Sequence, residues 1–366
     1  MAFSRQMNVV IVGAGPSGST VAYELAKDSH NVRVFEEHPA IGRPIACTGI
    51  VTRALFDFVE RDDDYIINEL EGVRITAPSG KTVDIPLKEF VICRERFDTF
   101  LAKRAIKAGA EYHTRFKFRS LDEGSKVARF SHKGKDVEVK YDILIGADGP
   151  FSAVARASGL LSRRKYYVGS QATVVGKFDP DWFLTFFGSC APGFFAWAVP
   201  ESAERVRAGV ASQRHVHKYF DLLREKFSGE IVERQAGPIP IFDGAKNVQK
   251  GSIYLVGDAA GVVKNTTGGG IITGMWSAKI LADCLRNNKN YSRALRPLRR
   301  ELLLHWKLRN MLDKFSDYDY ELLVDMMSKD SVKRILHKYP REYPSKFLWR
   351  LLLAQPRLIR FARFAI

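Results

Sequence analysis

The feature that most constrains this chain is a glycine-rich turn between a short apolar run and a helix near the N-terminus. Residues 9–12 are all β-branched and apolar, which favours a buried strand over a helix. Residues 13–18 then have the spacing G-x-G-x-x-G, and a second strand-like run ends at Glu36. A lone G-x-G-x-x-G is weak evidence, but this order of strand, turn, helix, strand and acid is typical of a dinucleotide site.

Each residue type in this turn has a physical task. We expect Gly13 to form the tight turn, Gly15 to let the backbone approach a pyrophosphate, and Gly18 to pack the helix on the strand. The helix N-terminus offers free N–H groups to the phosphates, and Ser17 is a further expected contact there. Glu36 can accept hydrogen bonds from a ribose. The alternative is a plain glycine-rich turn in a parallel sheet.

Length and charge limit the function classes. A chain of 366 residues is long enough for two or three structural units. The formal net charge is +16, and half of this excess lies in residues 333–366, where Glu342 is the single acid. An anionic surface or an anionic substrate is therefore the natural partner. Nucleic acid is not expected as a partner, because no recognised nucleic-acid module accompanies the charge.

The cysteines and the apolar runs indicate a compartment. The four cysteines are scattered without a C-x-x-C pair, which argues against a metal site or a disulfide framework and suits a reducing cytosol. The first strand begins within ten residues of the start, so we expect no signal peptide. No run of 18 or more uncharged apolar residues is present, so no transmembrane helix is expected.

The remaining pattern predicts an α/β fold in three parts. Two more buried strands are expected at residues 141–145 and 252–256, and an antiparallel sheet at residues 168–177, 182–187, 194–200 and 206–211. We also expect hairpins over residues 70–86 and 127–139, a strand over 111–118 and a helix over 295–323. The expected parts are a Rossmann-like cofactor domain (residues 1–60, 87–160 and 250–290), an antiparallel-sheet substrate domain (61–86 and 161–249) and a helical, basic C-terminal part (291–366).

Three later features distinguish between the dinucleotides that the opening turn allows. Arg94 stands three residues before a Phe-Asp pair, Asp148-Gly149 ends a buried strand, and Gly257-Asp258 ends another before a glycine-led helix. Together and in this order they resemble the flavoprotein monooxygenase and reductase superfamily, which has the fold of p-hydroxybenzoate hydroxylase. The resemblance covers about residues 8–285 and implies FAD as the cofactor.

The same resemblance implies further cofactor contacts. Asp258 would bind the ribityl chain and Arg94 the ribityl or phosphate portion, while Gly270 and Ile271 would meet the isoalloxazine. Phe118 falls where family members touch adenine through the backbone. The helix N-terminus near Gly270 suits negative charge on a reduced flavin ring. The alternative for Asp258 is a helix cap in a turn.

A closer resemblance rests on three segments: A-C-T-G at residues 46–49, F-x-W-x-V-P at residues 195–200, and GDAAGVVKNTTGGGI at residues 257–271. They are similar to the geranylgeranyl reductases, best to the archaeal enzymes that saturate isoprenoid chains of membrane lipids. Two positions differ from the family pattern, since Val199 replaces Phe and Asn265 stands where Pro is common. Neither change removes a titratable group, and we interpret both as changes of pocket shape.

The resemblance implies hydride transfer from reduced FAD to a C=C bond of an isoprenoid lipid, with a proton added to the other carbon. The expected proton donor is Cys47, with a flavin-bound water as the alternative. Cys47 and Gly49 are also expected beside the cofactor, although Cys47 equally fits a small buried apolar position. Phe195 and Trp197 are expected to line an apolar tunnel, the alternative being an ordinary place in the core.

The electron donor and the membrane contact remain open. No separate nicotinamide domain is visible, so NAD(P)H and reduced ferredoxin are both candidates. Residues 347–353 and 358–364 mix large apolar side chains with arginines. Such segments lie in a membrane interface or pack on the protein with a solvated basic face. We therefore expect a cytoplasmic protein that associates peripherally with membranes.

Three competing functions share the cofactor. An aromatic hydroxylase of the same fold would react with oxygen. A flavin-dependent halogenase needs paired tryptophans and a catalytic lysine, and only Trp197 stands in that element. A membrane-associated flavin electron carrier would need no large apolar tunnel beside the flavin.

Overall fold

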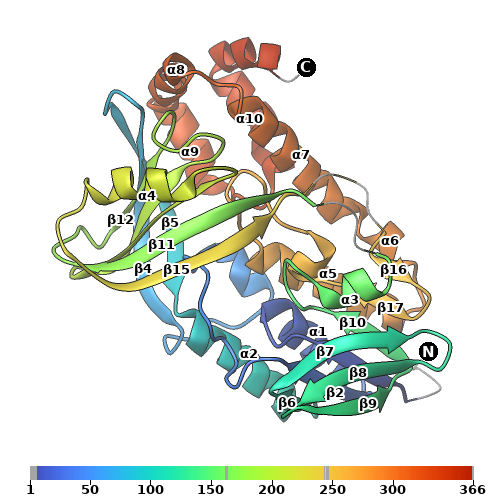
Figure 1. Cartoon of the computed structure of the whole chain (residues 1–366). Coiled ribbons are helices and arrows are strands. Elements are labelled where there is room, and N and C mark those ends of the chain that lie inside the picture. The colour runs from blue at the N-terminus through green and yellow to red at the C-terminus, as the bar shows by residue number, and fades with distance from the viewer. Residues whose placement is uncertain (1–5, 161–163, 243, 245–246, 365–366) are drawn as a thin grey trace.

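Three β-sheets and a set of C-terminal helices make up the fold (Figure 1). The computed structural model describes residues 6–160, 164–242, 244 and 247–364. In Figure 1 the six-stranded sheet and its helices lie on one side and the long strands of the eight-stranded sheet on the other. The C-terminal helices run along the top from the first sheet to the second. The expected α/β class with a sheet domain and a helical C-terminal part is confirmed.

The six-stranded sheet contains the three buried strands that the sequence predicts. Its order is β16-β17-β10-β1-β2-β6, with only the edge strand β16 antiparallel to its neighbour. The parallel strands end at one edge, so the turns after β1, β10 and β17 meet there. The strands are β1 (Asn8–Val12), β2 (Asn31–Glu36), β6 (Glu111–Thr114), β10 (Ile143–Gly146), β16 (Gln249–Lys250) and β17 (Ile253–Leu255).

Helices pack on the six-stranded sheet: α1 contacts β1 and β2, and α3 contacts β10. The helix α1 packs against both α2 and α5. The side chains of Val9, Val10 and Ile11 in β1 are completely buried, as a continuous β-branched run predicts. The bounds are α1 (Pro16–Lys27), α2 (Arg94–Lys107), α3 (Ala153–Ala157), α5 (Ile271–Arg286) and the 3₁₀ turns η1 (Arg53–Asp57) and η2 (Gly257–Ala260).

The eight-stranded sheet has the order β15-β11-β14-β13-β12-β4-β5-β3. The antiparallel sheet expected over residues 168–211 is confirmed, because β11, β14, β13 and β12 pair antiparallel with one another. The sheet also contains one parallel pair that we do not predict, β12 with β4. A parallel pair needs a long connection, and here the chain between these two strands returns through the first sheet. The bounds are β3 (Ile50–Thr52), β4 (Ile66–Thr76), β5 (Thr82–Ile92), β11 (Tyr166–Val175), β12 (Trp182–Phe186), β13 (Ala196–Ser202), β14 (Arg205–Ser212), β15 (Glu230–Pro240) and the helix α4 (Val216–Arg224).

The expected boundary between residues 86 and 87 falls inside a strand. β5 pairs with β4 from Thr82 to Ile92, and β3 pairs with β5. Residues 50–52 and 87–92 therefore belong to the eight-stranded sheet, because their strands pair within it. Apart from this correction, the division into three parts stays our proposal.

Two predicted elements are wrong in extent. The strand expected over 111–118 is broken at Arg115, whose φ is 65°, and its second half moves to a separate three-stranded sheet. The helix expected over 295–323 is two helices, because Ser316 forms a capping box with Asp319 and starts a new one. The three-stranded sheet contains β7 (Phe116–Asp122), β8 (Val127–His132) and β9 (Lys135–Lys140), which include the predicted second hairpin.

The C-terminal helices pack on both sheets. Leu298 and Leu302 of α7 are completely buried, and α9 packs on β5. A second set of apolar side chains on α10 and η3 is exposed, including Trp349 and Leu353. Within the described ranges no helix has the length and apolar character to span a bilayer. The bounds are α6 (Tyr291–Ala294), α7 (Arg296–Leu312), α8 (Asp317–Met327), α9 (Asp330–Lys338), α10 (Pro344–Ala354) and η3 (Pro356–Phe364).

Candidate active site

The glycine turn after β1 has the geometry that a pyrophosphate needs. Gly13 has a φ of 103°, and a Cβ there would lie 2.4 Å from the carbonyl oxygen of Ala147. A Cβ on Gly18 would lie 2.0 Å from the carbonyl oxygen of Gly13, so helix and strand touch at this point. No atom lies within 4 Å of a Cβ built on Gly15. The first and third glycines are therefore required by packing, while the second leaves space for a ligand.

Glu36 lies at the same edge of the sheet and is tied to the turn. Its carboxylate accepts hydrogen bonds from the backbone N–H of Ala14 at 3.0 Å and of His38 at 2.9 Å. The ring Nδ1 of His38 lies 2.7 Å from the same carboxylate. Glu36 is thus fixed beside the glycine turn, where a ribose contact is expected.

The Asp258 turn lies beside the glycine turn. The Ser17 hydroxyl would be 2.3 Å from a Cβ on either Gly257 or Gly274, so α1, η2 and α5 meet without space for side chains. A Cβ on Gly270 would lie 2.6 Å from Oδ1 of Asp258. Two distant segments thus converge, as the dinucleotide hypothesis requires.

The Asp258 carboxylate is suited to accept hydroxyl donors. Burial raises the pKa of Asp258, while Arg94 and Arg164 oppose that rise. Within the described ranges no side-chain or backbone donor bonds to this carboxylate, and it caps no helix. A half-buried carboxylate that no protein donor satisfies can accept its hydrogen bonds from a ligand or water. Together with the space above Gly15, this shows that the residues present fit FAD.

Asp148, by contrast, has a structural role. Its carboxylate accepts hydrogen bonds from the Ser152 hydroxyl at 2.5 Å and from the backbone N–H groups of Ala153 and Val154. It therefore closes the first turn of α3. The Asp148-Gly149 pair is thus a sequence signal of the fold, but the Asp148 carboxylate is already hydrogen-bonded within α3.

Arg94 lies between the Cys47 loop and the cofactor edge, the edge of the six-stranded sheet that carries the glycine turn and the Asp258 turn. Its guanidinium donates two hydrogen bonds to Asp98, at 3.0 and 2.8 Å. Burial opposes the charge on Arg94, but the Asp98 carboxylate and the Cys47 thiol together raise its pKa above the usual value. Arg94 also interacts with Asp258. The guanidinium is therefore a half-buried cation that faces the Cys47 thiol as well as Asp258.

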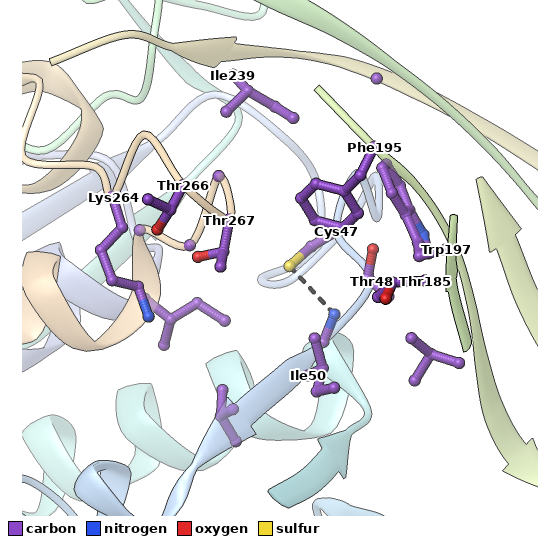
Figure 2. Close-up of a pocket in the computed structure, with 18 of the residues that line it drawn as sticks. Cys47, Thr48, Ile50, Thr185, Phe195, Trp197, Ile239, Lys264, Thr266 and Thr267 are labelled. Atoms are coloured by element: carbon purple, nitrogen blue, oxygen red, sulfur yellow. Dashed lines mark hydrogen bonds between the residues drawn. The ribbon is translucent and has the colours of Figure 1, made fainter. Parts of the chain in front are cut away.

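A cavity of about 300 Å³ lies between these turns and the eight-stranded sheet. Figure 2 shows Cys47 between the loop that carries Lys264, Thr266 and Thr267 and the wall formed by Phe195 and Trp197. Residues 268–272 also line it. The sheet wall is largely apolar and includes Val73, Ile75, Leu87, Phe183, Phe187 and Val199. Phe195 and Trp197 thus lie on the cavity wall as well as in the core.

Cys47 is half-buried and lines this cavity. Its Sγ accepts a hydrogen bond from the backbone N–H of Gly49 at 3.3 Å. Gly49 has a φ of 76°, and a Cβ there would lie 2.5 Å from the carbonyl oxygen of Ile92. The tight turn needs a glycine, and it presents the thiol to the cavity rather than to the core.

Phe118 lies at the far end of the cofactor edge, in β7. Its side chain is buried and contacts Phe130 edge to face, with ring centroids 5.7 Å apart. The β7–β8 ladder changes register between Phe118 and Ser120, which interrupts the regular backbone pairing there. The backbone contact to adenine stays a prediction.

A buried ionic cluster that the sequence does not predict lies at one end of the cavity. Lys264 forms an ion pair with Glu342, and the Thr52 hydroxyl donates to Glu342 at 2.5 Å. Burial raises the pKa of Glu342, but Lys264 and Thr52 overcome this and hold it at about 2. Beside it Arg341 pairs with Glu89. The signal that could have found this cluster was the lone acid in the basic C-terminal stretch.

A second missed group is the set of polar side chains on the sheet wall. Gln171 of β11 and Gln235 of β15 both line the cavity, and Arg207 of β14 is buried under the Cys47 turn. None of the three belongs to a recognisable motif in the sequence. No local pattern could reveal them, because their proximity depends on strand order and register.

The glycine turn, the Asp258 turn and the adjoining cavity define an FAD-dependent oxidoreductase. Residues 88–290, more than half of the chain, match the FAD binding domain family, and residues 11–48 match the NAD(P)-binding Rossmann-like domain. The chain belongs to the family of the digeranylgeranylglycerophospholipid reductases.

Three relatives support this assignment. The digeranylgeranylglycerophospholipid reductase 1 of Methanopyrus kandleri is 33% identical over 76% of this chain and 80% of that protein. The digeranylgeranylglycerophospholipid reductase of Thermoplasma volcanium is 29% identical over 92% of this chain and 96% of that protein. The solved structure of a geranylgeranyl bacteriochlorophyll reductase-like protein from Thermoplasma acidophilum has a TM-score of 0.86 at 25% identity, over 99% of this chain and all of that one.

Proposed function

We propose that this protein saturates C=C bonds of geranylgeranyl chains, specifically those of archaeal-type membrane glycerophospholipids. The observation that carries the proposal is the apolar cavity of about 300 Å³ between the glycine loops and the wall of Phe195 and Trp197. The named relatives act on such lipids according to their names. An apolar chain fits a cavity of this lining, because burial of its carbons is the main source of binding free energy.

When bound, FAD supplies the hydride that the alkene accepts on one carbon. The helix N-termini of α1 and α5 point at the cofactor edge and favour negative charge there. The residues that would hold FAD are Gly13, Gly15, Ser17 and Gly18 at the pyrophosphate, Glu36 at the ribose, Phe118 at the adenine, Arg94 and Asp258 at the ribityl chain, and Cys47, Gly49, Gly270 and Ile271 near the ring.

Cys47 donates the proton that the second carbon of the alkene receives. The new C–H bond takes the thiol proton and leaves the electron pair on sulfur as a thiolate. The Gly49 N–H and the Arg94 cation both face this sulfur and stabilise the thiolate that forms. The apolar sheet wall excludes water, which strengthens both interactions.

The direct test is reduction of the substrate. FAD-loaded protein, reduced with dithionite and given a geranylgeranylated glycerophospholipid, should yield products heavier by two hydrogens for each bond reduced. Oxygen consumption coupled to an aromatic acid, with no such mass gain, would replace the proposal by a hydroxylase. Electron transfer without any change in an added lipid would replace the proposal by an electron carrier. An electron carrier needs no apolar cavity, so the cavity favours the reductase.

The Cys47 assignment has its own variants. Cys47→Ser and Cys47→Ala should keep the yellow colour of bound FAD but slow alkene reduction by about 100-fold, the scale of a lost general acid. Cys190→Ser is the matched control, because Cys190 is also a free, half-buried thiol and does not line the cavity. Normal turnover in both Cys47 variants would transfer the role to a bound water.

NAD(P)H and reduced ferredoxin are the two electron donors that we propose to compare. Each is mixed anaerobically with the FAD-loaded protein, and bleaching of the yellow absorbance is followed. The donor that bleaches the flavin within the time of one turnover is the one that we assign to the reaction. A donor that needs hours is excluded.

We further propose that α10 and η3 attach the protein to an anionic lipid surface. Trp349, Leu352 and Leu353 lie on one face of α10 and are 51%, 41% and 72% exposed, and Ile359 of η3 is 65% exposed. Basic side chains accompany them, including Arg350. Exposed apolar side chains beside cations match the interface of a membrane with anionic headgroups.

Vesicle sedimentation tests this attachment. Wild-type protein should pellet with vesicles containing phosphatidylglycerol and be released by high salt. Joint replacement of Arg350, Arg357 and Arg360 by Gln should weaken binding, while joint replacement of Lys133, Lys135 and Lys140 on the distant β8–β9 hairpin should not. Equal loss in both triple variants would show that net charge alone determines binding.

A further inference from the structure

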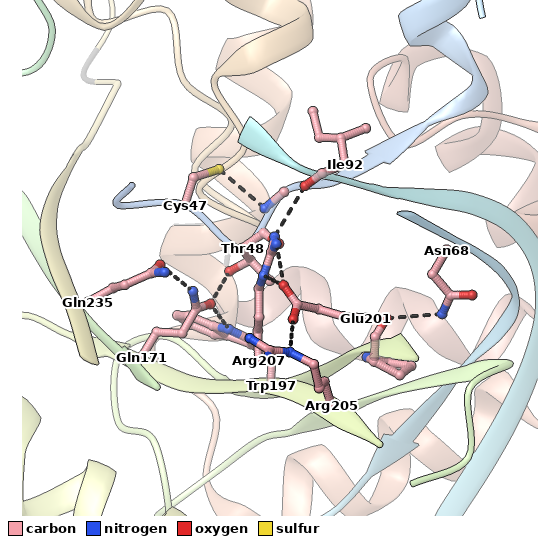
Figure 3. A network of polar contacts seen from close by, with 12 residues as sticks. Cys47, Thr48, Asn68, Ile92, Gln171, Trp197, Glu201, Arg205, Arg207 and Gln235 are labelled. Carbon is pink, nitrogen blue, oxygen red and sulfur yellow. Dashed lines mark hydrogen bonds and ion pairs between the residues drawn. The ribbon is translucent and has the colours of Figure 1, made fainter. Parts of the chain in front are cut away.

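One buried side chain connects the two walls of the cavity. Gln171 is 6% exposed, and its Oε1 accepts hydrogen bonds from the Thr48 hydroxyl at 2.7 Å and from the Trp197 indole N–H at 2.9 Å (Figure 3). Its Nε2 donates to Oε1 of Gln235 at 2.9 Å. The amide orientation follows from chemistry, since the indole N–H can only donate and must face the oxygen.

The backbone carbonyl of Thr48 is held by Arg207 of β14. Arg207 is 4% exposed and donates to the carbonyl oxygen of Thr48 at 2.6 Å and to that of Ile92 at 3.2 Å. Its other edge is fixed by Glu201, which accepts from Nε at 2.6 Å. A Cβ on Gly49 would lie 2.6 Å from the Arg207 guanidinium, so the turn already touches the sheet. Thr48 therefore has both its side chain and its carbonyl anchored to the eight-stranded sheet.

These anchors act on the thiol. Cys47 immediately precedes Thr48, and its Sγ is bonded to the N–H of the residue that follows Thr48. The position of the sulfur therefore depends on Thr48, and the position of the indole depends on the same Gln171 oxygen. Figure 3 shows Cys47, Thr48, Gln171 and Trp197 in one continuous set of contacts.

We infer that Gln171 is a positioning residue that holds the Cys47 thiol at a fixed separation from the Trp197 wall. This inference rests on the proposed function, in which an isoprenoid chain lies between the two and receives a proton from Cys47. A group misplaced by about 1 Å can lose about 100-fold in rate, so such an anchor matters for turnover without touching the alkene.

The test measures the thiol itself in FAD-loaded protein. Iodoacetamide labelling is quantified by mass spectrometry at Cys47 and at Cys190, and the ratio of the two rates is compared between variants. General destabilisation would raise both rates, whereas a change of position affects Cys47 alone. Gln171→Leu removes the shared acceptor, so we expect the Cys47:Cys190 ratio to change at least fivefold.

Matched variants separate the hydrogen bonds from the volume of the side chain. Gln171→Glu keeps an oxygen toward Thr48 and Trp197, and a flipped Gln235 amide can donate to it, so its ratio should stay within twofold of wild type. Thr48→Val removes the donor from the opposite side and should reproduce Gln171→Leu, while Thr48→Ser should restore the ratio. If Gln171→Leu is insoluble, the Thr48 pair decides.

The outcomes distinguish this inference from the proposed function. A shifted ratio with reduced kcat and unchanged FAD content supports both. A shifted ratio while Cys47→Ser turns over normally supports the positioning and refutes the proton donor. An unchanged ratio in both Gln171→Leu and Thr48→Val overturns the inference, whatever the lipid assay shows.

Discussion

The two walls of the cavity are built in different ways. The cofactor wall consists of turns whose shape is set by glycines, such as Gly49 and Gly270, so that backbone lies directly against neighbouring groups. The sheet wall consists of side chains from β4, β5, β11, β12, β13 and β15, and its polar members are held by hydrogen bonds between strands, such as that from Trp197 to Gln171. On the cofactor wall we therefore expect a substitution to be tolerated only where the added atoms meet no backbone. On the sheet wall we expect it to be tolerated only where the new side chain keeps the hydrogen-bond partners of the old one.

The largest effect should come from the glycine turn. Gly18→Ala places a Cβ 2.0 Å from the carbonyl oxygen of Gly13, so we expect a loss of more than about 5 kcal/mol of unfolding free energy and a colourless protein. Gly15→Ala is the control, because its Cβ meets nothing within 4 Å. The Gly15→Ala variant should keep the wild-type melting temperature but bind FAD more weakly than wild type, because the added methyl group occupies the space expected for the pyrophosphate. A yellow Gly18→Ala with unchanged melting would contradict the backbone-contact rule.

The next effect tests the ionic cluster between the walls. Glu342→Gln leaves the buried Lys264 ammonium without its partner, which should cost about 3–5 kcal/mol of unfolding free energy. Chemical denaturation measures this loss. The double variant Glu342→Gln with Lys264→Met should recover much of it, because no buried charge then remains unpaired. Equal stability of the single and double variants would mean that water reaches the lysine.

A smaller, pH-dependent effect should come from His305. Burial and the nearby Lys264 lower the pKa of His305 to about 3, and its Nδ1 lies 2.7 Å from the Thr266 hydroxyl. Below pH 6.5 the unfolded chain binds a proton that the folded protein refuses, so stability is present above this pH and lost as pH falls. The loss should be about 1.4 kcal/mol per pH unit.

His305→Gln isolates this contribution. The variant cannot bind the proton, so its unfolding free energy should fall less steeply than that of wild type between pH 6.5 and 5. Glu342 does not interfere, because its pKa of about 2 makes its contribution disappear only below about pH 4.5. Parallel pH curves for both proteins would show that His305 is hydrated.

The smallest effect should come from a charge pair outside the cavity. Asp325 lies 2.7 Å from Lys81, and both side chains are nearly half exposed. Asp325→Asn should change the unfolding free energy by less than about 1 kcal/mol, because water screens the pair. Thermal melting compares it with Glu342→Gln. Similar losses in the two would remove the distinction between buried and exposed pairs.

The successes and errors of sequence analysis follow the same division. The strands β1, β10 and β17 and the turns after them were predicted, because β-branched runs and glycine spacing are local signals. The break at Arg115 and the start of α8 at Ser316 were missed, since alternating or helical apolar patterns continue through both positions. The parallel pairing of β12 with β4 was also missed, because pairing partners leave no trace in either strand alone.

The site divides in the same way. The glycine turn, Asp258, Cys47 and the pair Phe195 and Trp197 were all named from the sequence, and the structure brings them to one edge and one cavity. Their individual roles remain predictions. Gln171, Arg207 and Lys264 with its partner were absent from that set, because a single polar residue on a strand or loop has no distinguishing pattern.

The sequence by itself determined the cofactor turn and the class of the fold, because glycine conformational freedom, strand burial and helix N-termini act over a few neighbouring residues. Only the tertiary structure decided which side chains face each other across the cavity. Hydrogen bonds and ion pairs act over about 3 Å, and residues such as Thr48 and Gln171, or Lys264 and Glu342, come within that distance only after the sheets and the C-terminal helices have packed.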